Sequence, residues 1–116
     1  VINNRSYSDA EIFPHAFRTL GLGKVVGQAT GGHVIGTTST RLIDGSQFRV
    51  PRTGVFTVQG VNMDKDGVPP DVAVEVDPAD WAKGTDTQLG KAVEVLQADV
   101  AAWKRQKGVI GKAPTP

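Results

Sequence analysis

The sequence SDAEIF at residues 8–13 opens a predicted helix a few residues after a short, apolar, strand-like segment, Val1–Ile2. A helix N-terminus leaves its first backbone N–H groups unpaired and carries partial positive charge, so it can hold an oxyanion. Strand–turn–helix nucleophiles use the same geometry. Ser8 or Asp9 can equally be a simple helix cap, and caps far outnumber nucleophiles. Local chemistry therefore favours the cap, and any further role has to be argued from the rest of the chain.

The composition is that of an ordinary globular domain: 39% of the 116 residues are apolar, 22% are charged, and the formal net charge is +1. This balance gives no electrostatic reason to propose a nucleic acid or an anionic membrane as a partner. The lack of cysteine excludes disulfides, thiolate catalysis and cysteine metal sites. Because the chain opens with Val1 directly in a strand-like segment, we expect a piece of a longer polypeptide. A whole protein that has lost its initiator residue is the alternative.

The spacing of apolar residues predicts a helix near each end of the chain. The first covers about residues 9–20 and contains Pro14, which should kink it or make its start irregular. The second covers about residues 89–103, behind a capping box at residues 85–88. Residues 112–116 are expected to form a disordered tail.

The middle of the chain is predicted to be extended. The Asp44-Gly45 pair between two alternating runs predicts a tight hairpin. Residues 30–36 form a glycine-rich turn that allows close backbone approach. Further strands or extended segments are expected at residues 24–27, 54–58 and 72–76.

No cluster of residues predicts a cofactor or a metal. His15 and His33 do not lie at a spacing typical of metal ligands, and the glycine turn lacks the lysine and hydroxyl of a phosphate-binding loop. Asp64, Asp66 and Asp71 do not match the spacing of an EF-hand loop. We therefore expect neither a metal nor a cofactor, and we interpret the three aspartates as part of a solvated loop.

Four stretches together resemble the catalytic core that tricorn proteases share with the tail-specific (C-terminal processing) serine peptidases. They are NNRSYSDAEI at residues 3–12, GLGKVVGQATGG at 21–32, DGVPPDV at 66–72 and GTDTQL at 84–89. Each is a weak pattern alone, but their order and spacing across residues 1–107 make the match specific. The resemblance therefore outweighs the helix-cap interpretation of Ser8.

The resemblance implies three catalytic positions in this sequence. Ser8 matches the family's nucleophile, and the backbone N–H of Asp9 would be one oxyanion donor. Many tail-specific peptidases use a lysine base about one strand later, but His33 stands near that position, so the chain looks like the tricorn branch, in which a histidine base comes from earlier in the protein. The acidic residue of that branch falls on Asp64, where the family more often has Glu. His33 itself could act as base only if the fold brought it within hydrogen-bond reach of Ser8.

The resemblance also implies a fold and a set of partners. The fold class is α/β, part of a crotonase/ClpP-like peptidase core with a mixed sheet, a hairpin and a long C-terminal helix. Residues 1–111 would be the C-terminal part of a serine peptidase catalytic domain, inactive alone because the base lies upstream of Val1. The expected partners are a peptide or protein substrate, the missing N-terminal part and a second copy in a homo-oligomer, with no nucleic acid and no membrane. The alternative is a non-catalytic ligand-binding or interaction module on the same fold, as in the similar retinoid-binding proteins of the photoreceptor matrix.

Overall fold

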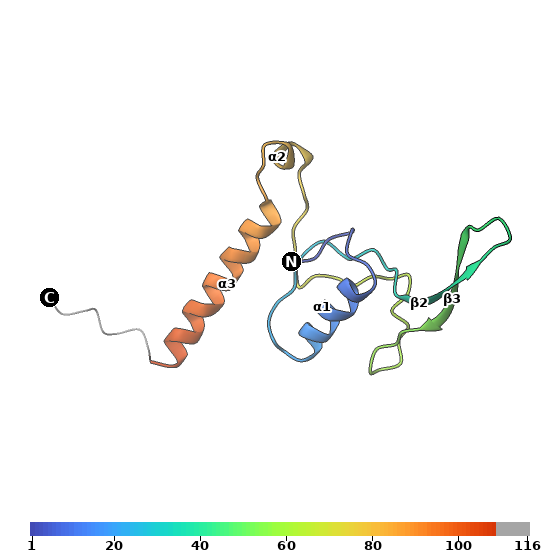
Figure 1. Ribbon diagram of the computed structural model, residues 1–116. Coiled ribbons are helices and arrows are strands. Elements are labelled where there is room, and N and C mark those ends of the chain that lie inside the picture. Colours follow the sequence, from blue (N-terminus) through green and yellow to red (C-terminus); the bar gives the residue numbers. More distant parts are fainter. Residues whose placement is uncertain (109–116) are drawn as a thin grey trace. The chain divides into compact units, whose positions relative to one another are not determined.

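The computed structural model describes residues 1–108 as an α/β chain that divides into two compact units (Figure 1). The N-terminal unit, Ile2–Ala73, contains one helix and four strands, and the C-terminal unit begins at Val74 and contains two helices. Each unit is described separately below. The elements are α1 (Asp9–Thr19), β1 (Val26–Gly27), β2 (Ile35–Arg41), β3 (Gln47–Gly54), β4 (Val72–Ala73), α2 (Pro78–Ala82) and α3 (Thr87–Gln106).

Helix α1 matches the prediction to within one residue. It runs unbroken through Pro14, which is buried in the helix. It ends where Gly21 adopts a positive φ of 65°, and the Leu22 N–H reaches back to the Phe17 carbonyl oxygen at 3.1 Å. This is the hydrogen bond that a left-handed residue after a helix makes possible.

The N-terminal unit contains a small parallel sheet. β1 pairs with β4, with Val26 opposite Val72 and Gly27 opposite Ala73. Ile2 adds a parallel bridge to Gly27 on the other side, with its N–H donating to the Val26 carbonyl oxygen at 2.9 Å. The backbones approach so closely that a Cβ built on Gly27 would lie 2.0 Å from the Ile2 carbonyl oxygen.

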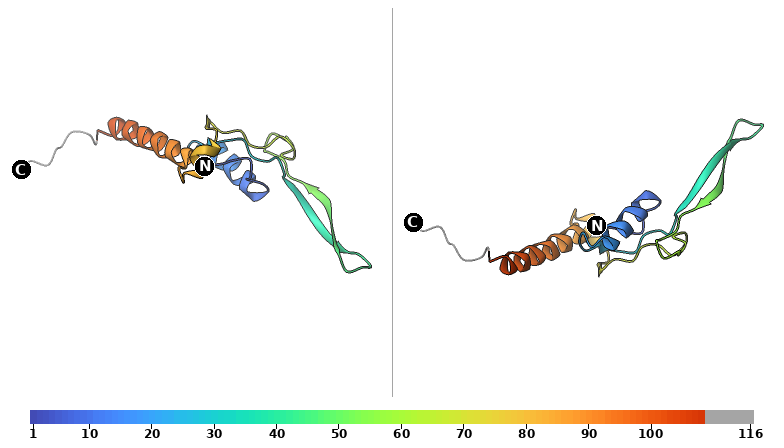
Figure 2. Two further views of the ribbon diagram at one scale, coloured as in Figure 1. Left: turned by 90° about the horizontal axis from the view of Figure 1, so that it is seen from above. Right: turned by 90° about the horizontal axis from the view of Figure 1, so that it is seen from below.

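The predicted hairpin is formed by β2 and β3, which are antiparallel, and it extends as an arm from the N-terminal unit (Figure 2). Leu42 accepts a hydrogen bond from Gly45 N–H at 3.0 Å, and Gly45 has a φ of 85°. This is a three-residue loop with a left-handed glycine. The parallel and antiparallel pairs lie in two separate sheets, rather than in the one mixed sheet that was expected.

The further strand expected at residues 54–58 is not formed. β3 continues to Gly54, and the chain then turns, with the Gly60 N–H donating to the Thr57 carbonyl oxygen at 2.9 Å. An isolated antiparallel bridge joins Phe56 to Asn62 across this turn. The turn replaces the strand because its backbone hydrogen bonds are satisfied locally.

The C-terminal unit contains the long predicted helix. Asp86 caps α3 by accepting from the Leu89 N–H at 2.9 Å, so the N-cap is Asp86 and not Thr85, and the predicted pairing of Thr85 with Gln88 was wrong. The short helix α2 was not predicted, although Asp77 at its N-cap and Pro78 at its first position are typical helix-start signals. No helix in residues 1–108 combines the length and hydrophobicity needed to cross a membrane. The predicted tail at 112–116 lies outside the described residues.

The hydrophobic core of the N-terminal unit is small. Val34, Met63 and Val68 are buried together, and Ile12 and Val55 pack against them. Its members come from α1 and from the loops around residues 34, 55 and 63–68. The core therefore places the first turns of α1 against the loops around residue 34 and residues 63–68, and these three segments form the candidate site.

Candidate active site

Ser8 lies at a strained turn directly before α1. Its φ of 57° and ψ of −123° are unusual for a residue with a Cβ, and such conformations cost on the order of 1–3 kcal/mol. The side chain is exposed, and the Ser8 N–H donates to the His33 carbonyl oxygen at 3.0 Å. A sharp turn into a helix that exposes a serine hydroxyl is the geometry of a nucleophile elbow.

Ser8 and Glu11 form a capping box at the start of α1. In this box, the Ser8 N–H donates to Glu11 Oε1 at 3.2 Å. The Glu11 N–H faces the Ser8 side chain, which completes the capping box, and it donates to the Ser8 carbonyl oxygen at 2.8 Å.

The Asp9 N–H has no hydrogen-bond partner within the described residues, whereas the next N–H, of Ala10, donates to the Tyr7 carbonyl oxygen at 3.1 Å. Unpaired N–H groups are expected in the first turn of a helix. The Asp9 side chain is exposed. A free backbone donor therefore stands directly after the serine.

Glu11 is the residue that sequence reasoning missed. It is fully buried, with 0% of its surface exposed, although carboxylates are almost never buried without a partner. Its Oε2 accepts from the Thr30 hydroxyl at 2.5 Å and the Gly32 N–H at 2.8 Å, and its Oε1 accepts from the His33 N–H at 2.7 Å as well as from Ser8. In the sequence, the S-x-x-E spacing of residues 8–11 predicts the contact between Glu11 and Ser8. It does not predict the contacts of Glu11 to Thr30, Gly32 and His33.

The loop that binds Glu11 is bonded on its other side to residues 65–68. The Thr30 hydroxyl accepts from the Val68 N–H at 2.6 Å, and the Lys65 N–H donates to the Gly32 carbonyl oxygen at 2.7 Å. The approach is so close that a Cβ built on Gly32, at a φ of 73°, would lie 2.5 Å from the Lys65 carbonyl oxygen. Ser8 and Lys65 are the two non-glycine residues with positive φ in the part of the chain that the structure describes.

The hydrogen bonds to Glu11 also change its acidity. Burial raises the pKa of the Glu11 carboxyl, but the hydrogen bonds from Thr30, His33, Gly32 and Ser8 stabilise the carboxylate and outweigh burial. The net effect is a pKa below the ordinary value of 4.5. Glu11 is thus a buried anion held by neutral donors.

Asp64, the predicted acid, lies at the edge of this network. It is half-buried and directly precedes Lys65, and its N–H donates to Asn62 Oδ1 at 3.0 Å. Its loop is brought to the Ser8 turn through the contacts of residues 30–33. No hydrogen bond joins the Asp64 carboxylate to Ser8 within residues 1–108.

Neither histidine of the chain reaches the Ser8 hydroxyl. His33 touches Ser8 and Glu11 through its backbone, and no hydrogen bond between its ring and Ser8 is found in the described part of the chain. His15 lies seven residues along α1, about 10 Å along the helix axis. Its ring is 3.5 Å from Thr19 Oγ1.

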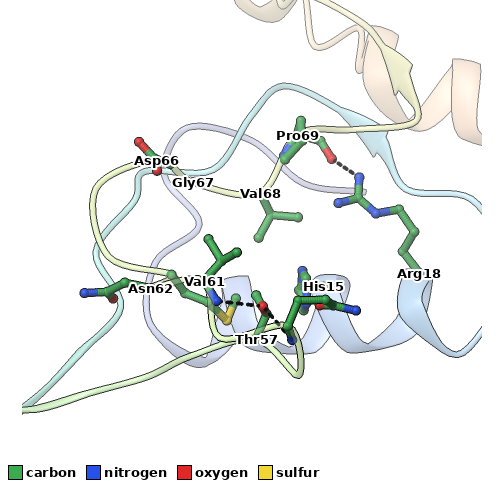
Figure 3. A pocket seen from close by; sticks show the side chains of 11 residues that line it. His15, Arg18, Thr57, Val61, Asn62, Asp66, Gly67, Val68 and Pro69 are labelled. Atoms are coloured by element: carbon green, nitrogen blue, oxygen red, sulfur yellow. Dashed lines mark hydrogen bonds between the residues drawn. The ribbon is translucent and has the colours of Figure 1, made fainter.

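His15 instead faces a separate pocket of about 310 Å³ in the N-terminal unit (Figure 3). His15 and Arg18 from α1 form one side, and Val61 and Val68 point into the space from the loops opposite. Arg18 is bonded to the Pro69 carbonyl oxygen at 2.7 Å. Among residues 1–108, no group of three or more histidine, cysteine or acidic side chains is arranged to hold a metal.

Comparison with known proteins shows the family of this chain. The model of Peptidase family S41 matches residues 1–74, which include the Ser8 turn, Glu11 and Asp64. The chain belongs to Peptidase family S41. The S41 match ends at β4, so it covers the N-terminal unit.

Individual relatives extend the S41 similarity into the C-terminal unit. The chain is 36% identical to the tricorn protease of Thermoplasma acidophilum over 108 residues, and 41% identical to tricorn protease homolog 1 of Streptomyces coelicolor over 101 residues. These matches cover 91% and 84% of this chain but only 10% and 9% of the relatives. A crystal structure of the tricorn protease superposes with a TM-score of 0.78 at 36% identity, over 84% of this chain and 10% of that one. The chain thus spans about a tenth of the length of these relatives.

The charge of Glu11 predicts how stability depends on pH. Because folding lowers its pKa below 4.5, its contribution is complete above that value and is lost as the pH falls through the folded-state pKa. We expect the difference in free energy of unfolding between the unaltered chain and Glu11→Gln to shrink as the pH falls from about 6 to about 3. Denaturant titration at each pH measures it.

Glu94→Gln is the matched control, because Glu94 is exposed and bonded only to Lys91 among the contacts described. Its difference from the unaltered chain should stay close to zero over the same range. A Glu11→Gln difference that remains constant or grows toward acid pH would show that the carboxylate is not stabilised as an anion.

Proposed function

We propose that this chain carries the nucleophile of a serine peptidase, and that Ser8 forms the acyl-enzyme. The observation that supports it most is the exposed, strained Ser8 turn in a chain of Peptidase family S41. A free N–H, that of Asp9, directly follows the serine. Strain of this kind persists where surrounding structure enforces it, which is typical of functional sites.

In the proposed reaction, Ser8 Oγ attacks the carbonyl carbon of a peptide bond while a histidine accepts the hydroxyl proton. The negative charge that develops on the carbonyl oxygen is stabilised by the Asp9 N–H, through the backbone and not the side chain. The histidine gives its proton to the leaving amine, and water then hydrolyses the ester on Ser8. Asp64 supports this relay as its acidic member.

The histidine base and the second oxyanion donor come, in this proposal, from the remainder of the catalytic domain. Neither His15 nor His33 bonds to the Ser8 hydroxyl in the described residues, and the relatives are about ten times as long as this match. Together the two parts would form the crotonase-like peptidase core, to which this chain would contribute residues 1–111 as the C-terminal part. The chain alone should be inactive, because a serine without its base is a weak nucleophile.

Exposed apolar side chains support a need for partners. Five large apolar side chains of α3 are each at least 41% exposed, namely Leu89, Val93, Leu96, Val100 and Trp103. Contiguous apolar surface of this kind is typical of interaction sites. We propose pairing with the rest of the catalytic domain and assembly as a homo-oligomer, with a peptide or protein as substrate.

A fluorophosphonate reagent tests the nucleophile directly, because it reacts with serine hydroxyls that a base has activated. In the complete protease we expect one labelled peptide, carrying Ser8, and complete loss of labelling in Ser8→Ala. Ser39→Ala is the control, since Ser39 is an exposed residue of β2. Labelling that persists in Ser8→Ala, or is absent from the unaltered protease, would contradict the proposal and favour a non-catalytic module.

Substitution of Asp64 tests the acidic role separately. Asp64→Asn should lower kcat of the complete protease by at least about 100-fold, the scale of general acid–base contributions. Asp64→Glu should keep most of the activity, because the carboxylate is retained. Asp66→Asn is the control at an exposed neighbouring position. Equal effects of Asp64→Asn and Asp66→Asn on kcat would remove Asp64 from the mechanism.

A further inference from the structure

We infer that Glu11 is the positioning residue of this site: its buried carboxylate holds the Ser8 turn in register with the loop that carries Asp64. This inference rests on the proposed function of Ser8. It concerns a residue that does not touch the reacting atoms. Its effect would be transmitted through hydrogen bonds to the backbone on both sides.

The first step is from Glu11 to Ser8. The carboxylate lies one helical turn after the serine and accepts the Ser8 N–H at 3.2 Å, while the Ser8 peptide also donates to the His33 carbonyl oxygen at 3.0 Å. These two acceptors hold the peptide that precedes the strained φ of 57°. Without these two acceptors, Ser8 could relax toward an ordinary backbone conformation, and its hydroxyl would point in a different direction.

The second step is from Glu11 to the loop at residues 30–33. Three donors of this loop converge on one carboxylate: the Thr30 hydroxyl and the backbone N–H groups of Gly32 and His33. All are neutral, and no cation is bonded to Glu11 in the described residues. A neutral side chain in this place would leave at least one of these buried donors without an acceptor, because an amide nitrogen is itself a donor.

The third step is from the loop at residues 30–33 to the loop at residues 64–68. Thr30 receives the Val68 N–H on its hydroxyl while donating to Glu11, so one oxygen joins the two sides. Gly32 does the same through its backbone, because its N–H donates to Glu11 and its carbonyl oxygen accepts from the Lys65 N–H. Asp64 immediately precedes Lys65. The path from Ser8 to Asp64 thus runs through Glu11 and two residues of one loop.

The test compares Glu11→Gln with a pair of variants at Thr30 in the complete protease. The measurements are KM and kcat. The number of active sites in each preparation is counted by fluorophosphonate labelling of Ser8 in a separate sample, and kcat is expressed per active site. Glu11→Gln should lower kcat per labelled site by about 100-fold, as expected when a catalytic group is misplaced by about 1 Å, with a much smaller change in KM. Thr30→Val should lower it by about tenfold, the equivalent of one hydrogen bond to a charged group.

Thr30→Ser is the matched control, because it retains the hydroxyl that joins Glu11 to Val68, and it should keep kcat within about twofold of the unaltered protease. A merely structural role would reduce the number of labelled sites or the melting temperature and leave kcat per site unchanged. That result would overturn the inference. If Glu11→Gln does not fold, the comparison of Thr30→Val with Thr30→Ser provides the test. Equal kcat per site in these two variants would overturn the inference.

The two levels of the proposal fail in different ways. Absence of labelling at Ser8 in the unaltered protease would contradict the proposed function, and the inference would fall with it. Normal labelling and catalysis in the unaltered protease together with unchanged kcat per site in the Glu11 and Thr30 variants would contradict the positioning role alone.

Discussion

The N-terminal unit depends on one buried carboxylate. Glu11 has no exposed surface and is surrounded by four donors from the Ser8 turn and the loop at residues 30–33. A buried anion without donors would be far too costly, so the loop has to remain in place for the unit to stay folded. The close backbone approaches at Gly32 follow from this requirement. The same contacts hold Ser8 in its strained conformation, so the stability of the unit and the geometry of the proposed site have one origin.

Much of the architecture could be predicted from the sequence because it is locally encoded. The two long helices follow from apolar spacing, and the hairpin follows from Asp44-Gly45, although the left-handed Gly45 gives a three-residue loop. The strand expected at residues 54–58 was wrong, because the hydrogen bonds of a turn outweighed the strand-like pattern. Local patterns predict elements well where no competing local structure exists.

The site was predicted less completely, because its geometry depends on contacts between distant residues. Ser8, Asp9 and Asp64 were named through the family resemblance, and their roles remain predictions. Glu11 was visible only as the partner in a capping box, whereas its bonds to Thr30, Gly32 and His33 span 19 to 22 residues. Nothing in a local sequence pattern distinguishes an exposed glutamate in the first turn of a helix from a buried one. The two cases differ only in the loop that folds over the glutamate, which the sequence shows as Thr30-Gly31-Gly32-His33.

We propose Ser8 as the nucleophile, with the Asp9 N–H donating to the oxyanion that forms on the substrate's carbonyl oxygen. A crystal structure of the complete protease after reaction with a peptidyl phosphonate tests this proposal most directly. We expect a covalent bond between Ser8 Oγ and phosphorus, with a phosphoryl oxygen about 3 Å from the Asp9 nitrogen and the Glu11 contacts intact. A phosphonate bound to another residue, or a phosphoryl oxygen turned away from the Asp9 N–H, would contradict it.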